Sequence, residues 1–188
     1  MLYVIVGLVW LTAAIIAGAT GLTQRLQPPT PQLVLAGLTL LLLLTSQLAS
    51  GFRGWLHGLG WRPLVTLHLA RFVGLYFLYL YQRGELPYAF AVPGGLGDIA
   101  VAVLALGLLL APRLVSHRPA LLFTWNVLGL LDILFVVVTA SRLAMSEPGS
   151  MDAVLRLPLS LLPTFLVPLV IASHVWLFGQ LRRWERAA

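Results

Sequence analysis

The chain has 188 residues, of which 60% are hydrophobic and 10% are charged, and its mean hydropathy is +0.95. Soluble domains carry about 25% charged residues, so this composition excludes a water-soluble globule and predicts an all-α, polytopic membrane protein of a single domain. The net charge of +6 comes from 12 arginines with no lysine; because they are scattered singly between apolar runs, the charge does not indicate nucleic-acid binding.

The first apolar run covers residues 2–22 and predicts a membrane-spanning helix. It has no basic residue before it and no good cleavage signature after it, so we expect a retained helix rather than a signal peptide. Ala14 with Gly18, and Ala17 with Gly21, form two pairs of small residues at four-residue spacing that predict close contact with another helix. That helix can belong to the same chain, to a second copy or to a different membrane subunit.

Residues 33–50 predict the second span, and residues 64–82 predict the third. Between them lies the sequence GFRGWLHGLGWRP at residues 51–63. Its tryptophans suit the headgroup layer of the membrane, whereas its four glycines weaken any helix. We therefore expect an interfacial loop over this stretch, and the alternative is a lipid-sensing helix.

The fourth span is predicted over residues 97–111, which is shorter than the roughly 20 helical residues that cross the hydrocarbon core. The preceding stretch GELPYAFAVPGGLGD, residues 84–98, is apolar but too short to span. This pattern favours a re-entrant segment, which must be buried in protein or line a wet cavity. Asp98 would then begin the fourth helix as its N-cap, and the alternative is that the free N–H groups of that helix start bind an anion.

Residues 120–141 predict the fifth span, and residues 158–181 predict the sixth. Pro158, Pro163 and Pro168 interrupt the outer half of the sixth span. This half cannot keep a continuous ladder of backbone hydrogen bonds, so we expect the helix to kink there.

Six spans put both chain ends on the same side of the membrane. Seven arginines then lie on that side and four on the opposite side, and the positive-inside rule places both termini in the cytoplasm. The seven are Arg53, Arg62, Arg113, Arg118, Arg182, Arg183 and Arg186, and the four are Arg25, Arg83, Arg142 and Arg156.

Three strings carry a resemblance: PGGLGDI at residues 93–99, FTWNVLGLLDI at 123–133 and LPTFLVPLVIASHVWLFGQL at 162–181. With them, about the last two-thirds of the chain resembles a group of small bacterial integral membrane proteins that has no assigned activity. The resemblance implies a shared six-helix membrane fold with a recurring arrangement of Asp, Trp-Asn and Pro-Pro-His, and it leaves the function open. We expect the protein to lie in a bacterial inner membrane.

Polar side chains within the spans suggest a function. A rise of about 1.5 Å per residue places Arg71, Asn126 and His174 in one layer, about 10 to 12 Å from the cytoplasmic face, and Asp98 and Asp132 in a second layer about 20 Å from it. A charge facing lipid costs about 2.5 to 3.5 kcal/mol on insertion scales, so these side chains should point inward. The leading hypothesis is a polar cavity among the third to sixth helices that binds or passes a small solute or a proton.

Two other interpretations stay open at this point. The same residues can be buried pairs that hold the helices together in an accessory subunit of a larger membrane complex, whose partners would be lipids, other subunits or a second copy. Arg71 itself pairs with Asp98 or Asp132, bridged by Asn126, or else extends toward the cytoplasmic headgroups.

A third hypothesis is a b-type haem protein, because His68 and His174 lie at similar depths and two imidazoles can ligate one haem iron. No other cofactor and no metal site is expected, since the chain has no cysteine and no HExxH spacing. Ser141 and Ser173 lie in no recognisable nucleophile turn. The sequence therefore favours a protein that is not an enzyme.

Overall fold

The computed structural model describes residues 1–187, with side chains described through Arg183. Helices make up 85% of it, and the described part contains no strand. Six helices in this part are long and apolar enough to cross a membrane. The predicted all-α, polytopic fold is therefore confirmed.

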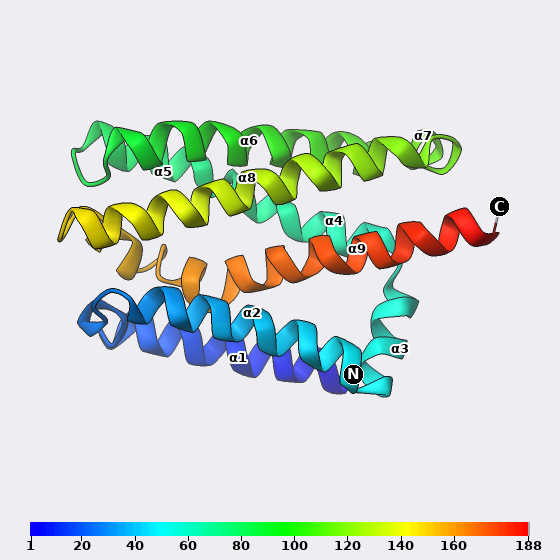
Figure 1. Ribbon diagram of the computed structural model, residues 1–188, viewed down its shortest axis with the longest axis horizontal. Helices are drawn as coiled ribbons and strands as arrows, with labels where there is room; N and C mark the ends of the chain where they lie inside the picture. The colour runs from blue at the N-terminus through cyan, green and yellow to red at the C-terminus, as the bar shows by residue number, and fades with distance from the viewer. Residues whose placement is uncertain (188) are drawn as a thin grey trace.

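The six spans run side by side along the long axis of the molecule (Figure 1). In chain order they are α1 (Leu2–Ala19), α2 (Thr30–Leu48), α4 (Trp61–Leu67) continuing through the 3-10 turn η2 (His68–Val73) into α5 (Gly74–Gln82), α6 (Tyr88–Leu110), α8 (Pro119–Ser146), and the π-helical turn η4 (Leu162–Leu166) continuing into α9 (Val167–Ala187). The shorter elements are η1 (Thr23–Arg25), α3 (Ser50–Leu59), α7 (Pro112–His117) and η3 (Asp152–Leu155).

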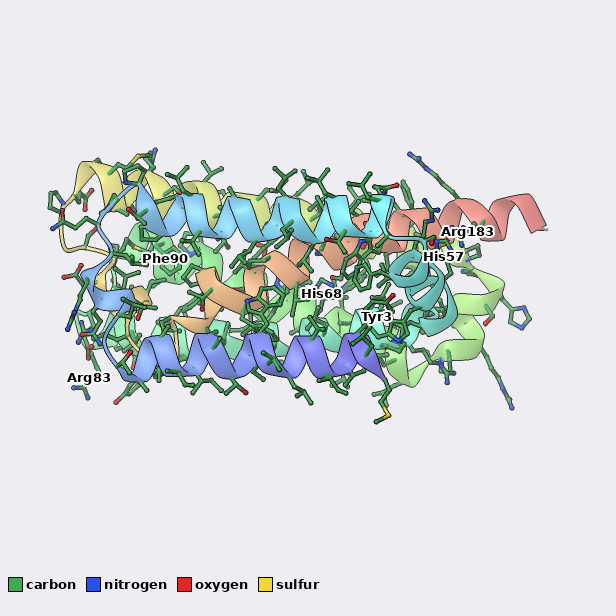
Figure 2. The ribbon with its side chains drawn as sticks, turned by 90° about the horizontal axis from the view of Figure 1, so that it is seen from below. Tyr3, His57, His68, Arg83, Phe90 and Arg183 are labelled. Atoms are coloured by element: carbon green, nitrogen blue, oxygen red, sulfur yellow. The ribbon has the colours of Figure 1, made fainter. Side chains whose placement is uncertain are left out.

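Both chain ends lie at one end of the bundle, on the right in Figure 1, together with α3 and α7. We call this the near end and the opposite one the far end. Figure 2 shows His57 and Arg183 at the near end, Arg83 at the far end and His68 midway between them. The arginine-rich connections predicted to share one side of the membrane, in α3 and α7, thus lie with the termini.

The prediction of an interfacial loop over residues 51–63 is wrong, because Ser50–Leu59 forms the helix α3. The helix is amphipathic: Phe52 and Leu56 are buried, and Phe52 packs against Tyr3, Trp55 and Trp176. Burial of this face outweighs the roughly 1 kcal/mol that each helical glycine costs relative to alanine. α3 ends at Gly60, whose φ of 67° turns the chain into α4.

The predictions of a short fourth helix and of a re-entrant segment over residues 84–98 are also wrong. α6 runs without interruption from Tyr88 to Leu110, 23 residues, which is long enough to span. Pro93 is tolerated near its start, and Pro87 occupies the N-cap position. Asp98 therefore lies inside the helix, so neither its predicted role as an N-cap nor an anion site at a helix start in this turn remains.

The predicted break in the sixth span is present. Its outer part is a turn followed by the π-helical turn η4, and regular α-helix begins only at Val167. An irregular backbone within a bilayer needs partners for its carbonyl groups. One is supplied by α1, since Trp10 Nε1 donates to the carbonyl oxygen of Thr164 at 2.9 Å.

The small residues of α1 make their close contact inside the chain. Ala14 and Gly18 are buried, and a Cβ added at Gly18 would lie 2.6 Å from Ser160 Oγ and 2.7 Å from a side-chain carbon of Leu157. The sequence left open whether the contact is made within the chain, with a second copy or with a different subunit. For Ala14 and Gly18 it is made within the chain, with the segment that leads into the sixth span.

Two hydrophobic cores lie in the bundle, one toward each end. The near-end core consists of Trp61, Leu64, Val65, Val101, Ala105, Val115, Leu122, Trp125, Leu177 and Leu181. The far-end core consists of Phe77, Leu80, Leu86, Phe90, Ala91, Ile133, Val136, Leu143, Met151, Ala153, Leu159, Val167 and Val170.

Candidate functional site

Arg71 joins three spans through its guanidinium group. Nε donates to Asp98 Oδ1 at 2.6 Å, Nη1 donates to the carbonyl oxygen of Gly129 at 2.9 Å, and Nη2 donates to Asp132 Oδ2. The side chains of Arg71 and Asp98 are 3% and 4% exposed, and that of Asp132 is 19% exposed. Arg71 therefore pairs with both acids rather than with one, and it does not extend toward the headgroups. We call Arg71, Asp98 and Asp132 the charged triad.

The depth count had placed Arg71 a layer below the acids, and the 3-10 turn explains part of the difference. Each residue of a 3-10 helix rises about 2.0 Å instead of 1.5 Å, so the first four residues of η2 carry Arg71 about 2 Å closer to the acids. Arg71 thus belongs to the layer of Asp98 and Asp132, not to that of Asn126 and His174.

Glycines bring the backbones of the triad close together. A Cβ at Gly74 would lie 2.3 Å from the carbonyl oxygen of Gly95, and a Cβ at Gly97 would overlap Asp132 Oδ1. Only glycine fits at such contacts. The glycine-rich string around residues 94–97 therefore serves helix packing against α5 and α8, rather than the turn that its composition predicted.

A second polar group lies beside the triad, on its near-end side. His174 Nδ1 and Asn126 Oδ1 are 2.8 Å apart, and Asn126 Nδ2 donates to the backbone oxygen of His174 at 3.0 Å. His68 Nε2 and Ser173 Oγ are 2.9 Å apart. All four side chains are fully buried. Asn126 thus binds His174. The predicted bridge from Arg71 through Asn126 to the acids is absent among the described residues.

The two polar groups meet at Gly129 of α8. Its carbonyl oxygen accepts from Arg71, and a Cβ at this position would lie 2.7 Å from Cε1 of His174. His68 and Ser173 were not predicted as part of this site, although both lie on helix faces turned toward it. The five predicted solute- or proton-binding residues lie near one another, in two groups rather than one network; four of them are buried and Asp132 is half-buried.

The histidine pair does not fit a haem between its rings. The ring centroids of His68 and His174 are only 4.3 Å apart, so the imidazoles contact each other directly. Two axial ligands must hold the porphyrin between them, and the contact leaves no space for that plane. Among the described residues, no group of three or more His, Cys, Asp or Glu side chains is arranged to hold a metal ion.

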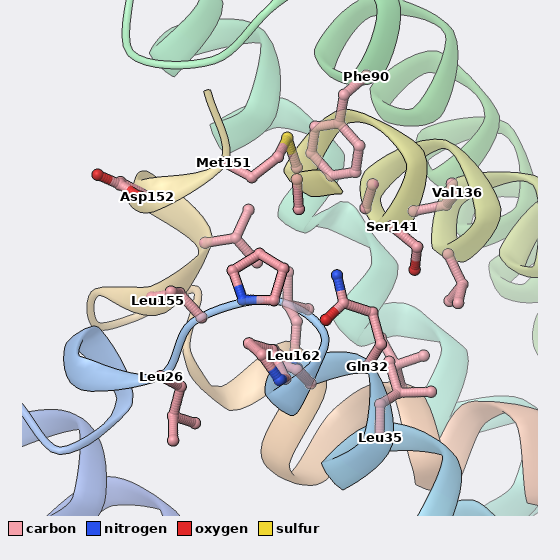
Figure 3. Close-up of a pocket in the computed structure, with 18 of the residues that line it drawn as sticks. Leu26, Gln32, Leu35, Phe90, Val136, Ser141, Met151, Asp152, Leu155 and Leu162 are labelled. Carbon is pink, nitrogen blue, oxygen red and sulfur yellow. The ribbon is translucent and has the colours of Figure 1, made fainter. Parts of the chain in front are cut away.

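A cavity of about 790 Å³ extends from Arg71 and Asp98 of the charged triad to the far end of the bundle. Figure 3 shows some of the side chains that line it, among them Gln32 and Phe90. Arg71 and Asp98 lie at its inner end, and the connections around Gln27 and Asp152 lie at its outer end. α2 contributes Gln32 and Leu35 to its wall, so the cavity is not confined to the third to sixth spans as predicted. Its other wall residues include Phe77, Phe90, Ile133, Val136, Val137, Ala140, Ser141, Leu162, Val167 and Val170.

Comparison with known proteins identifies a family without an assigned activity. No curated protein and no solved structure matches the chain. Residues 28–182, which include all but the first of the six spans, match the family described as "Domain of unknown function (DUF8737)", and the chain therefore belongs to that family.

Proposed function

We propose that this integral membrane protein binds a small solute in the cavity, together with a proton at the charged triad. One observation carries the proposal: the cavity of about 790 Å³ reaches two buried residues of opposite charge, Arg71 and Asp98. Ligand sites are typically concave, mostly apolar and supplied with a few convergent polar groups. Charges within a membrane are candidates for function by default, because they are costly to place there.

The charge balance of the triad supports proton binding. One guanidinium and two carboxylates leave a net charge of −1, and an unbalanced charge is costly in a medium of low dielectric constant. One bound proton makes the triad neutral. Two further titratable side chains lie beside the triad on its near-end side, His68 of η2 and His174 of α9, and both are fully buried.

The closed near end favours binding over free passage. The near-end core, with Trp61, Leu122 and Leu177 among its members, fills the bundle between the histidine pair and the near end. A solute in the cavity therefore meets packed apolar side chains beyond the triad. Passage across the membrane would require this core to open.

The cavity proposal is tested by filling the space from α8. Ala140 lines the cavity, so Ala140→Phe should block it, whereas Val138→Phe places the same side chain on the lipid-facing surface two residues away, where Val138 is 65% exposed. We expect 1-naphthalenemethanol, an apolar fluorescent probe, to bind saturably to purified protein. Ala140→Phe should weaken this binding at least about tenfold, which corresponds to about 1.4 kcal/mol. Equal binding by both variants would exclude the cavity as the binding site.

We further propose that the protein is not an enzyme and that it lies in a bacterial inner membrane with both termini in the cytoplasm. The distribution of arginines over the connections supports this orientation. A fluorescent reporter that folds only in the cytoplasm, fused to the C-terminus, should therefore be bright.

An accessory role in a larger membrane complex is the second candidate. It is favoured by the exposure of α1 and α2, since only 11% and 6% of the residues in their membrane windows are buried. Purification from native membranes separates the two proposals. Stable co-migration with other subunits supports the accessory role, and a lone monomer or homo-oligomer supports solute binding.

A further inference from the structure

The charges that line the cavity differ in sign from the charge of the whole chain. The chain has 12 basic and 6 acidic residues, but the cavity is lined by one basic residue, Arg71, and by two acidic residues, Asp98 and Asp152. Arg71 is already bound by Asp98, Asp132 and the carbonyl oxygen of Gly129. From this contrast we infer that the solute is an amphipathic cation, a protonated amine on an apolar body, whose ammonium group lies against Asp98.

This inference rests on the proposed function and adds the chemical class of the solute. The triad needs one positive charge to become neutral, and an ammonium group can supply that charge in place of the proton. An anion would instead approach two carboxylates that a single guanidinium only partly balances. The low dielectric constant around the site increases this discrimination.

Two hydrogen-bond acceptors in the cavity can accept from a bound solute. Gln32 Oε1 is buried and has no hydrogen-bond partner among the described residues, and Figure 3 shows the Gln32 side chain pointing into the cavity. Asp98 binds Arg71 through Oδ1, which leaves the second oxygen of its carboxylate for another donor. A buried acceptor without a partner costs about 1 to 3 kcal/mol, and an N–H group of the solute would remove that cost.

The remaining wall requires an apolar body. Phe77, Phe90, Ile133, Val136 and Val167 belong to the far-end core and also line the cavity. A volume of about 790 Å³ lies within the range of roughly 300 to 1,000 Å³ that is typical of sites for small organic molecules. A small hydrated inorganic cation would leave these apolar walls without contacts.

Three probes with the same apolar body and different charge test the inference. 1-Naphthylmethylammonium is a cation, 1-naphthylacetate is an anion, and 1-naphthalenemethanol is neutral. Binding to the purified wild-type protein at neutral pH is measured by calorimetry in a neutral detergent. We expect the cation to bind most tightly, and the difference from the alcohol should be about 10-fold to 100-fold, as for a hydrogen bond to a charged group.

Two variants test whether the preference for the cation depends on residues of the cavity. Asp98→Asn should abolish the preference for the cation, while Arg71 keeps Asp132 as a partner. Gln32→Leu breaks no hydrogen bond of the described side chains, so the fold should persist, and it should weaken binding of the cation more than binding of the alcohol. The matched control is Glu85→Gln, which removes an acidic charge at the far end that does not line the cavity; it should change neither affinity.

The outcomes separate this inference from the proposed function. If the alcohol binds and Ala140→Phe blocks it, but the cation binds no better than the anion, the cavity binds a solute and the inference is overturned. The inference also falls if the preference for the cation survives both Asp98→Asn and Gln32→Leu. If none of the three probes binds, the proposed function and the inference fail together.

Discussion

Replacing Arg71 with leucine should destabilise the protein by about 3 to 5 kcal/mol, the range for removing one partner of a buried ion pair. Two carboxylates, those of Asp98 and Asp132, then lose their shared cation inside the bundle. The carbonyl oxygen of Gly129 loses its donor as well. The melting temperature in detergent should fall markedly, and Arg71→Lys should recover only part of it, because a lysine cannot reproduce the fork geometry of the guanidinium.

A double-mutant cycle separates loss of the pair from loss of packing. In Arg71→Leu combined with Asp132→Asn, one of the stranded carboxylates is neutral, so the double variant should be no less stable than Arg71→Leu alone. Additive effects would contradict the pairing. Arg83→Leu is the control, because Arg83 pairs with Glu85 at 2.8 Å on the exposed far end and should contribute little.

A single methyl group at Gly74 should also have a large effect. The Cβ of Gly74→Ala would lie 2.3 Å from the carbonyl oxygen of Gly95 and 3.1 Å from Asp98 Cβ. The first of these neighbours is backbone and cannot rotate away, so α5 and α6 must separate. Overpacked sites cost about 1 to 3 kcal/mol and sometimes more, and we expect the upper part of this range, measured as melting temperature in detergent.

The matched control for Gly74→Ala is Gly107→Ala on α6. Gly107 is exposed and no atom lies within 4 Å of its added Cβ, so alanine should leave stability unchanged or raise it by up to about 1 kcal/mol. Because Gly74→Ala also displaces Asp98, it should weaken binding of the naphthyl cation, whereas Gly107→Ala should not. Equal melting temperatures for the two variants would refute the close approach of α5 and α6.

Composition alone predicted the spans, because the bilayer imposes both the length and the apolar character of each helix. The errors arose where packing decided the local structure. Glycines at residues 51–60 and 94–97 indicated loops, yet α3 and α6 are helical there, since burial of Phe52 and close contact at Gly95 outweigh helix propensity. The amino-acid sequence alone does not distinguish a glycine-rich turn from a glycine-rich contact between helices.

The polar residues themselves were identified from the sequence, but their partners were not. A count of helical rise assumes regular α-helix, and the 3-10 turn at η2 moved Arg71 into the layer of Asp98. Counting the rise along single helices also could not predict the cavity. Its wall combines Gln32 of α2 with Ala140 of α8 and with the connections at the far end, which no local pattern relates to one another.

The hydrogen bond from Trp10 to the carbonyl oxygen of Thr164 bears on how the protein is made. Trp10 lies 154 residues before Thr164 in the chain, so α1 leaves the ribosome long before the segment around Thr164 does. Until the two meet, the proline-interrupted segment presents an unsatisfied carbonyl group to lipid, which costs several kcal/mol. Synthesis of the sixth span should therefore be followed by a docking step, in which α1, made earlier, packs against the segment around Thr164.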